Sequence, residues 1–339
     1  MEHQDRKLTD NTGEKRMNAE EPMKPIGEVL RNLQSDINGR SNEAVRGRLQ
    51  VEKKSSECLC QSCGKTFTGE ITTYIFPPDW QQKIKPGVLV PHLPREYRPQ
   101  NCPECQAKLA AEEEAKRQEE LVAARRATVA AWRRTCGIPV YLASKTFDNF
   151  EEGLQRDAFR DAREWVENFN VENPLGYPSL IFYSAEPGLG KTHLMVAMAN
   201  YLFDHWQGAP GRGRSPIIFV KGPQLVRRIR YTYNLPPEDY THEREEDVYR
   251  EITGVPLLLL DDVGKETPSK FTRETYWYII DERVTSGLPV IITSRLQLEG
   301  ANSLEQLIGE DTVDRLYGMA RGEITEMTGQ SYRGQKGIP

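Results

Sequence analysis

The chain has 339 residues, of which 37% are hydrophobic and 28% are charged, and its formal net charge at pH 7 is -5. This length suits about two domains, and the net acidity excludes a protein that is basic overall, so any nucleic-acid contact requires a local basic patch. The longest apolar run, residues 255–260, is too short to cross a bilayer, and the polar N-terminus contains no signal-peptide core, so we expect a cytoplasmic protein with no membrane partner.

Residues 1–56 form a polar segment rich in Glu, Lys, Asn, Ser and Gln. Within it, apolar side chains recur at helical spacing at Ile26, Val29, Leu30, Leu33 and Ile37. We interpret this segment as a mobile tail that carries one short amphipathic helix. Two hypotheses remain open for the helix, because it can dock on a partner or pack on the protein's own next domain.

Residues 57–105 contain two Cys-x-x-Cys pairs in a stretch rich in proline and aromatic residues. The paired cysteines are Cys60, Cys63, Cys102 and Cys105. Their spacing suits four thiolate ligands around a tetrahedral Zn²⁺, which can hold together a module with a small hydrophobic core. Cys58 or His92 is an alternative for one ligand, and unmetallated or redox-active cysteines are the other hypothesis. We expect Cys136 to be an ordinary buried thiol.

Residues 106–136 are predicted to be a charged helical linker. The sequence from Gln106 to Arg134 contains no Gly or Pro and consists mainly of Ala, Glu, Lys, Arg and Leu, which favours one long helix. We expect its charged side chains to form a solvated face.

Residues 137–339 alternate between apolar runs and helical segments. The predicted strands are 179–184, 217–221, 256–261 and 289–294. Strands that alternate with helices are typical of an α/β fold with a parallel sheet flanked by helices. We therefore expect one such domain after the linker.

The first of these strands leads into a sequence typical of a phosphate-binding loop. Its glycines, Gly188 and Gly190, let backbone amides turn towards a phosphate, and the helix N-terminus adds its positive dipole end. Lys191 is expected to reach the β- and γ-phosphates of ATP, and the Thr192 hydroxyl to ligate Mg²⁺. The first glycine of the usual motif is replaced by Ala185. The full set of expected nucleotide contacts in this loop is Pro187, Gly188, Leu189, Gly190, Lys191, Thr192 and His193.

The strand at 256–261 ends in two carboxylates. We expect it to lie beside the phosphate-loop strand, with Asp261 holding Mg²⁺ through water and Asp262 polarising the attacking water. The alternative is a core strand followed by an ordinary turn. Because Asp262 is one methylene shorter than the Glu that many ATPases carry at this position, we expect slow hydrolysis.

Two further elements carry candidate sites for the γ-phosphate. Thr293 and Ser294, at the end of the next strand, can sense it, or they are ordinary strand-end hydroxyls. Arg315 can supply positive charge to the transition state at a neighbouring subunit, or it is a surface ion-pair partner.

Several of these motifs resemble the DnaC, DnaI and IstB group of AAA+ proteins, which includes bacterial and phage helicase loaders. The matching segments are Gly137-Ile-Pro, Thr146-Phe-Asp-Asn-Phe, Gly188 to Leu194, Leu260-Asp-Asp-Val-Gly-Lys-Glu, Ile292-Thr-Ser, Asp314-Arg-Leu and Gly329-Gln-Ser-Tyr-Arg. The resemblance implies that Arg315 is an arginine finger and that Arg333 is a second sensor near the nucleotide. The sensor strand of the group commonly ends Thr-Ser-Asn, whereas this chain has Arg295 at the Asn position. The resemblance also implies an AAA+ P-loop domain without a C-terminal helical lid.

The resemblance further implies that single-stranded DNA binds to the helical segment after the second strand. The residues concerned are Lys221, Arg227, Arg228, Arg230, Tyr231 and Tyr233. Guanidinium groups neutralise phosphates and tyrosine rings stack on bases, so the residue types agree with this placement. An ordinary exposed basic helix is the alternative.

The function expected from this resemblance is that of an ATP-dependent helicase loader in the initiation of DNA replication. It implies a hexameric replicative DNA helicase as a partner of the zinc-bearing N-terminal part, self-association of the AAA+ domain, and ATPase activity stimulated by a partner or DNA. One alternative is a transposition regulator of the IstB or TnsC kind, which binds duplex DNA and a transposase. Another is a nucleotide-gated adaptor with negligible hydrolysis.

Overall fold

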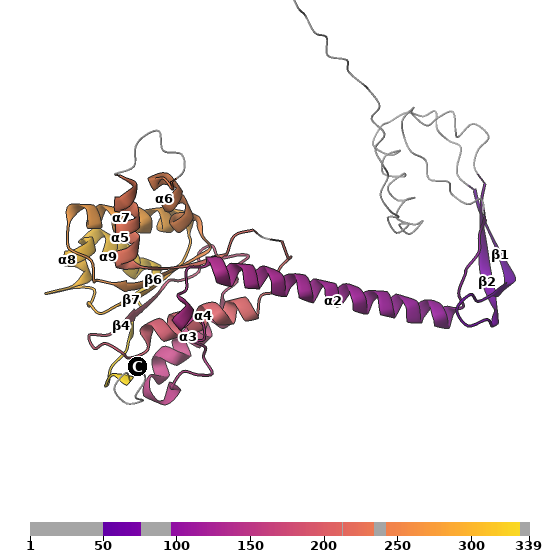
Figure 1. The fold of residues 1–339 in the computed structure, drawn as a ribbon, viewed down its shortest axis with the longest axis horizontal. Coiled ribbons are helices and arrows are strands. Elements are labelled where there is room, and N and C mark those ends of the chain that lie inside the picture. The colour runs from indigo at the N-terminus through magenta and orange to yellow at the C-terminus, as the bar shows by residue number, and fades with distance from the viewer. Residues whose placement is uncertain (1–49, 76–95, 212, 234–241, 333–339) are drawn as a thin grey trace, which may run out of the picture. The chain divides into compact units, whose positions relative to one another are not determined.

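The computed structural model describes residues 50–75, 96–211, 213–233 and 242–332 (Figure 1). The amphipathic helix expected at residues 26–37, the candidate ligand His92 and the candidate sensor Arg333 lie outside these residues. The chain divides into two compact units, Met1–Ala110 and Ala111–Pro339, each of which is described by itself. Among the described residues, no helix is both long enough and apolar enough to traverse a bilayer.

The described part of the first unit is a small antiparallel sheet next to the cysteine pairs. Strands β1 (Gln50–Leu59) and β2 (Thr66–Ile75) form a hairpin, and β3 (Glu96–Tyr97) pairs with β2. Strand β1 begins inside the segment that the sequence suggested as a tail. Its residues are polar on both faces, so the alternation that identifies a half-buried strand is missing.

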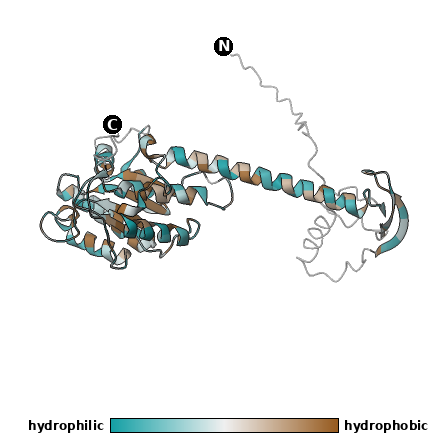
Figure 2. Ribbon diagram, turned by 90° about the horizontal axis from the view of Figure 1, so that it is seen from below, coloured by the Kyte–Doolittle hydropathy of each residue, from teal (hydrophilic) through white to brown (hydrophobic). Residues whose placement is uncertain are grey.

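Helix α2 (Pro103–Thr135) begins in the first unit and ends in the second. It is longer than predicted by a few residues at its start, where Pro103 is well tolerated because the first turn of a helix needs no N–H donor from that position. Hydrophilic residues dominate most of its length (Figure 2), and Trp132 near its end is its one buried residue. The end of α2 belongs to the second unit and packs within it, where the centroid of the Trp132 ring lies 4.5 Å from that of the Trp206 ring.

The second unit contains a five-stranded parallel sheet with the strand order β5-β6-β7-β4-β8. Figure 1 labels three of these strands, β4, β6 and β7. Its strands are β4 (Leu180–Tyr183), β5 (Ile217–Lys221), β6 (Leu257–Val263), β7 (Val290–Ser294) and β8 (Thr325–Glu326). The four predicted strands and the α/β fold class are confirmed. The short strand β8 was not predicted, because two residues are too few to show a pattern.

Helices cover both faces of this sheet. They are α3 (Arg156–Asn168), α4 (Lys191–Asp204), α5 (Gly222–Thr232), α6 (Glu245–Gly254), α7 (Lys270–Ser286), α8 (Leu304–Ile308) and α9 (Glu310–Met319). Successive strand residues point to opposite faces. In β6, Leu257 and Leu259 therefore join the core that includes α3 and α4, whereas Leu258 and Leu260 join the core that includes α5 to α9.

The neighbours of the acidic strand differ from the expectation. Strand β6 pairs with β5 and β7, and β7 lies between β6 and the phosphate-loop strand β4. The expectation that the acidic strand lies directly beside the phosphate-loop strand is therefore wrong. Because all these strands are parallel, their carboxyl ends still meet at one edge of the sheet, where the candidate site lies.

Candidate nucleotide site and metal centre

The loop between β4 and α4 has the backbone shape that phosphate binding requires. Gly188 and Gly190 both adopt left-handed conformations, with φ of 81° and 97°. A Cβ atom on Gly190 would lie 2.6 Å from the Phe150 ring, so only glycine fits without displacement of that ring. Helix α4 begins at the next residue, so its unpaired N-terminal amides face the loop.

Lys191, the first residue of α4, is buried and faces the end of β4. Its Nζ donates to the Ser184 hydroxyl at 2.5 Å and to the Ser184 carbonyl oxygen at 3.3 Å. Burial lowers the pKa of Lys191 to about 8, since desolvation disfavours the ammonium form. An anion at this loop would stabilise that charge. Nothing in the sequence pattern singles out Ser184, since a hydroxyl is an ordinary feature of a strand end.

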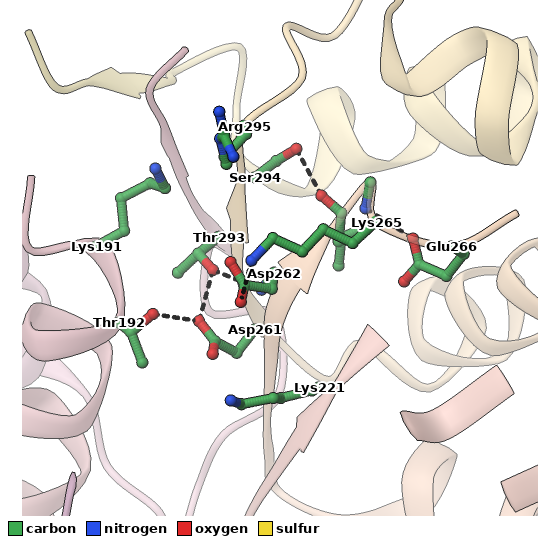
Figure 3. Close-up of polar contacts among 12 residues, drawn as sticks. Lys191, Thr192, Lys221, Asp261, Asp262, Lys265, Glu266, Thr293, Ser294 and Arg295 are labelled. Carbon is green, nitrogen blue, oxygen red and sulfur yellow. Dashed lines mark hydrogen bonds and ion pairs between the residues drawn. The ribbon is translucent and has the colours of Figure 1, made fainter. Parts of the chain in front are cut away.

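Three oxygen-bearing side chains meet at the predicted magnesium position (Figure 3). The Thr192 hydroxyl donates to Asp261 Oδ1 at 2.6 Å, and the Thr293 hydroxyl donates to the same oxygen at 2.8 Å. Burial raises the pKa of Asp261, although the two hydroxyls oppose that shift. A buried carboxylate beside a threonine hydroxyl supplies the oxygen ligands that Mg²⁺ prefers, so these residues fit the ion.

Asp262 has an unusual backbone conformation for a residue other than glycine, with φ of 57°. Its backbone N–H donates to the Thr293 hydroxyl at 2.8 Å, and its side chain forms an ion pair with Lys265 at 2.7 Å. Thr293 thus connects the two aspartates of the acidic strand rather than presenting a free hydroxyl to the loop. Next to Lys265, the buried Glu266 accepts hydrogen bonds from the Gly264 N–H and the Tyr276 hydroxyl.

The other residues of the loop that were expected to contact the nucleotide differ from one another in burial and in their partners. Leu189 is buried in the core and Pro187 is exposed. The His193 ring packs edge-on against Phe150, and its Nε2 lies 2.9 Å from the Thr146 carbonyl oxygen. Burial lowers the pKa of His193. Its contacts anchor the segment in front of the loop.

The polar residues at the end of β7 have different hydrogen-bond partners. The Ser294 hydroxyl donates to the Val263 carbonyl oxygen at 2.7 Å and accepts from the Leu296 N–H, so it is engaged with backbone. Arg295, at the next position, is exposed and lies 3.4 Å from the Ala185 carbonyl oxygen of the phosphate loop. Of the two sensor candidates, Thr293 is the one that contacts other site residues.

The described end of the chain also reaches the phosphate loop. The Tyr332 N–H donates to the Gly188 carbonyl oxygen at 3.2 Å, and the Tyr332 hydroxyl accepts from the Gln155 amide at 3.1 Å. Arg333 is the next residue in the chain, directly after this contact.

The predicted arginine finger lies on α9 and contacts α7. Arg315 Nε donates to Asp281 Oδ1 at 2.9 Å, and both side chains are about one third exposed. The same region contains the fully buried Arg283, which donates to the carbonyl oxygens of Ile252 in α6 and of Val255 directly after α6.

The predicted DNA-binding residues lie at the end of β5, along helix α5 and directly after it. Arg227, Arg230, Tyr231 and Tyr233 are exposed, and Lys221 donates to the Tyr141 hydroxyl at 3.0 Å. Arg230 also lies over the Phe271 ring, and the Tyr233 hydroxyl donates to Glu245. Arg228 differs from the others.

Arg228 is half-buried and held by two carboxylates. It forms ion pairs at 2.5 Å with Glu243 and with Glu251 of α6. Both raise its pKa, with the hydrogen bond to Glu243 the larger cause. The sequence did not indicate these partners.

In the first unit, the four paired cysteines converge. Their sulphur atoms all lie within 4.8 Å of one another, and the Cys63 and Cys102 sulphurs are 3.8 Å apart. Four sulphurs around Zn²⁺ at a bond length of about 2.3 Å are about 3.8 Å from each other, so the cluster fits the ion. Cys58 is not a member of the cluster; its thiol lies 3.8 Å from the Ser56 carbonyl oxygen.

Because the four sulphurs lie close together, they and the backbone around them shift the pKa values of two of the thiols. Backbone hydrogen bonding from Cys102 is the main cause that lowers the pKa of Cys60 to about 6. Hydrogen bonds to the Cys102 and Cys63 sulphurs raise the pKa of Cys105 to about 12. A divalent cation would allow all four to be thiolates, because it offsets their mutual repulsion. Cys136 is buried away from the cluster, as predicted.

Comparisons with known proteins add the following findings. A comparison with protein-family profiles gives no match. The replicative helicase loader DnaC of Buchnera aphidicola subsp. Acyrthosiphon pisum is 29% identical over 182 residues, which are 53% of this chain and 66% of that protein. DnaC of Escherichia coli K12 is 28% identical over 174 residues, 50% of this chain and 62% of the relative. The chain thus spans slightly less than two thirds of the length of either relative. A crystal structure of the DnaC helicase loader aligns with 56% of this chain and all of its own, with 25% identity and a TM-score of 0.43.

Proposed function

Because this chain is a DnaC-like AAA+ protein, we propose that it binds and hydrolyses ATP at the edge of the parallel sheet and that it loads a replicative DNA helicase. The observation that supports the nucleotide site most directly is the 2.6 Å contact between Thr192 and Asp261. It joins the start of α4 to the acidic end of β6, at the position where a phosphate-bound Mg²⁺ requires oxygen ligands.

Each residue of the site has a distinct task in this proposal. The amides around Gly188 and Gly190 hold the β-phosphate, and Lys191 neutralises the β- and γ-phosphates. Mg²⁺, held by Thr192 and Asp261, supplies positive charge to the phosphate oxygens when it is bound. Asp262 accepts the proton of the attacking water.

Two further parts complete the proposed site: Thr293, and the residues near the end of the chain that contact the phosphate loop. Thr293 fixes both aspartates, since its hydroxyl donates to Asp261 and accepts from the Asp262 N–H. We assign to it the sensor role through these two residues. Arg333 follows Tyr332, whose N–H bonds to Gly188, and we retain it as a second sensor.

Substitution of Lys191 tests the nucleotide site. Titration of a fluorescent ATP analogue with Mg²⁺ should show saturable binding to the wild-type chain and none to Lys191→Ala. Lys270→Ala is the matched control, because Lys270 is 89% exposed and pairs with Glu274 on α7. Equal affinity of Lys191→Ala and the wild type would refute the phosphate-loop assignment.

The loading function adds macromolecular partners to the nucleotide site. We propose that the zinc-bearing first unit binds a hexameric replicative DNA helicase and that the exposed face of α5 binds single-stranded DNA. We propose a cytoplasmic location for this function. The two relatives described above are both named replicative helicase loaders, which supports this choice over transposition.

Self-association is part of the same proposal. Arg315 would leave Asp281 and reach the γ-phosphate of a neighbouring subunit, where its charge stabilises the transition state. A single, partly exposed ion pair of this kind contributes little to stability, so the exchange of Asp281 for a phosphate costs little.

Size-exclusion chromatography with multi-angle light scattering tests whether the chain binds a replicative helicase. The purified chain should form a stable complex with the replicative helicase in the presence of ATP and Mg²⁺. If the chain does not bind the helicase and instead forms an ATP-dependent filament on duplex DNA, the proposal is wrong and the chain is a regulator of the transposition kind.

A further inference from the structure

Helices α6 and α7 pack against each other (Figure 1) and line a cavity of about 720 Å³ on the second unit. One face of α6 lines it at helical spacing with Glu246, Tyr249 and Thr253. One face of α7 lines it in the same way with Phe271, Glu274 and Tyr278. The site proposed for ATP shares no residue with this cavity, so the cavity requires its own explanation.

Aromatic rings form much of the wall. They belong to Tyr233, Tyr249, Phe271, Trp277 and Tyr278. The centroids of the Tyr249 and Tyr278 rings lie 4.7 Å apart in an edge-on pair, whereas Trp277 is 42% exposed and pairs with no described ring. The face of an aromatic ring carries partial negative charge and attracts cations, most strongly for tryptophan. The chain already places one cation in this way, since the Arg230 guanidinium lies 5.0 Å from the Phe271 centroid.

Negative charge is in excess around the same cavity. Its carboxylates are those of Glu245, Glu246 and Glu274. The single cation in the wall, Arg250, forms an ion pair with Asp247 at 2.9 Å. Glu245 accepts a hydrogen bond from the neutral Tyr233 hydroxyl at 2.7 Å, and within the described residues no cation pairs with it. The cavity can therefore attract a further positive group.

Thr275 adds a hydrogen-bonding group that is not used within the described residues. This side chain lines the cavity and is 1% exposed. Its hydroxyl is close enough to that of Tyr249 to oppose the rise in the pKa of Tyr249 that burial causes, but it meets the geometry of a hydrogen bond with no described residue. A buried hydroxyl without a partner is unfavourable, so a donor that enters the cavity would be stabilised there.

These three features together select the chemistry of the occupant. A guanidinium group is planar, stacks on aromatic faces and donates several hydrogen bonds to carboxylates. A phosphate would be repelled by the three carboxylates. A metal ion needs converging ligands, and among the described residues the only such group is the cysteine cluster of the first unit. A cavity of this volume holds several side chains, which suits a peptide segment better than a single small ion.

We infer that the cavity between α6 and α7 is a docking site for an arginine-bearing segment of another protein. The arginine stacks on Trp277 and pairs with the carboxylates of Glu245 and Glu274, while Thr275 accepts one of its hydrogen bonds. The proposed helicase contact belongs to the first unit, so this site adds a second, separate protein contact. Binding at this site requires neither ATP nor Mg²⁺.

Fluorescence anisotropy with the full chain and a defined peptide tests the inference. The probe is a fluorescein-labelled peptide of six residues in which alanine and arginine alternate. In the control peptide each arginine is replaced by citrulline, which is neutral and has nearly the same shape. The arginine peptide should bind saturably, and the citrulline peptide about ten-fold more weakly, because it lacks the charge that the carboxylates and rings attract. Equal binding of the two peptides, or no saturable binding, overturns the inference.

Substitutions in the wall locate the bound peptide. Glu245→Gln combined with Glu274→Gln removes two charges, and the new amide oxygens can still accept hydrogen bonds. We expect this double variant to bind the arginine peptide about two- to thirty-fold more weakly, the range for two exposed ion pairs. Glu299→Gln removes an exposed carboxylate outside the cavity and should bind as the wild type does. Equal affinities of the double variant and this control overturn the inference, and the citrulline comparison needs no variant to fold.

Trp277 gives a readout at the cavity itself. The other tryptophans of the described residues are buried: Trp132, Trp165 and Trp206. Trp80, outside the described residues, contributes equally to the wild type and to Trp277→Leu. The unlabelled arginine peptide should protect the wild type from acrylamide quenching but not Trp277→Leu, which should bind it about two- to five-fold more weakly. Equal protection of both proteins would place the peptide elsewhere and overturn the inference.

Sedimentation velocity decides whether a second copy of this chain is the occupant instead. The wild type and the double glutamine variant should show the same distribution of oligomers with ATP and Mg²⁺. Loss of self-association in the variant would assign the cavity to an interface between copies and overturn its assignment to another protein.

Discussion

The Thr192 hydroxyl lies 2.6 Å from Asp261 Oδ1, although 69 residues separate the two in the chain. The contact exists because α4 starts, and β6 ends, at the same edge of the parallel sheet. Thr293 joins the arrangement from β7, the strand between the two. The phosphate-binding and acidic segments thus contact each other directly, and a hydroxyl on a third segment donates to the same carboxylate oxygen.

Replacement of Thr293 by valine tests the role of this hydroxyl. Thr293→Val keeps the shape of the side chain but removes its hydrogen bonds to Asp261 and to the Asp262 N–H. We expect about a 10- to 150-fold loss of affinity for ATP in the presence of Mg²⁺, since loss of a hydrogen bond to a charged group costs about 1.5–3 kcal/mol. Binding measured in EDTA should change little. Ser294→Ala, whose hydroxyl bonds to the Val263 carbonyl oxygen, is the control, and equal effects of both variants would contradict the assignment.

The pH dependence of ATP binding should report on Lys191. Burial lowers its pKa from 10.5 to about 8, so the free site loses the ammonium charge as the pH rises through 8. The phosphates bind the charged form. Affinity should therefore be nearly constant below about pH 7.5 and fall above pH 8, because binding then requires uptake of a proton.

A Lys191→Arg variant provides the control for this pH dependence. Its guanidinium stays charged over the whole range, so its affinity, although lower, should not fall between pH 8 and 9.5. Isothermal titration calorimetry in buffers of different ionisation enthalpy measures both the affinity and the proton uptake. The same decline in both proteins would assign the pH dependence to another group.

Much of the second unit was predictable, because buried strands and a phosphate loop produce local patterns. The apolar run from Leu257 to Leu260 is bounded by Pro256 and Asp261, and the strand found there begins and ends within two residues of the prediction. The strand order was not predictable in the same way. Whether β7 or β6 lies next to β4 depends on the crossover connections, and either order buries the same apolar residues.

The residues of the site that were missed have partners distant in sequence or lie in turns. Lys265 follows a glycine in a polar turn and looks like any surface lysine until its contact with Asp262 is known. Arg228 looks like its basic neighbours, because Glu243 and Glu251 lie 15 and 23 residues further along the chain. Spacing along one helix cannot identify such partners.

Metal removal should unfold the cysteine cluster. The four sulphurs lie within 4.8 Å of one another, and without a cation their thiolates repel. We expect about one equivalent of zinc per chain by atomic emission, and loss of that zinc in Cys105→Ser. Cys136→Ser is the control, since Cys136 is buried outside the cluster. Zinc retained by Cys105→Ser but lost from Cys58→Ser would mean that Cys58 is the fourth ligand.

Arg227 and Arg228 should respond differently to substitution, because they are adjacent in sequence but have different surroundings. Arg227→Ala removes an exposed cation and should weaken binding of a labelled oligothymidylate about three- to ten-fold. It should also lower the slope of log affinity against log salt concentration by about 0.7, the value for one phosphate contact on a single strand. Arg228→Ala leaves Glu243 and Glu251 without their cation, so its main effect should be a lower Tm. Fluorescence anisotropy at several salt concentrations, with thermal unfolding of both variants, measures these effects. An unchanged salt slope in Arg227→Ala would exclude α5 from the DNA contact, since Arg227 belongs to its exposed face.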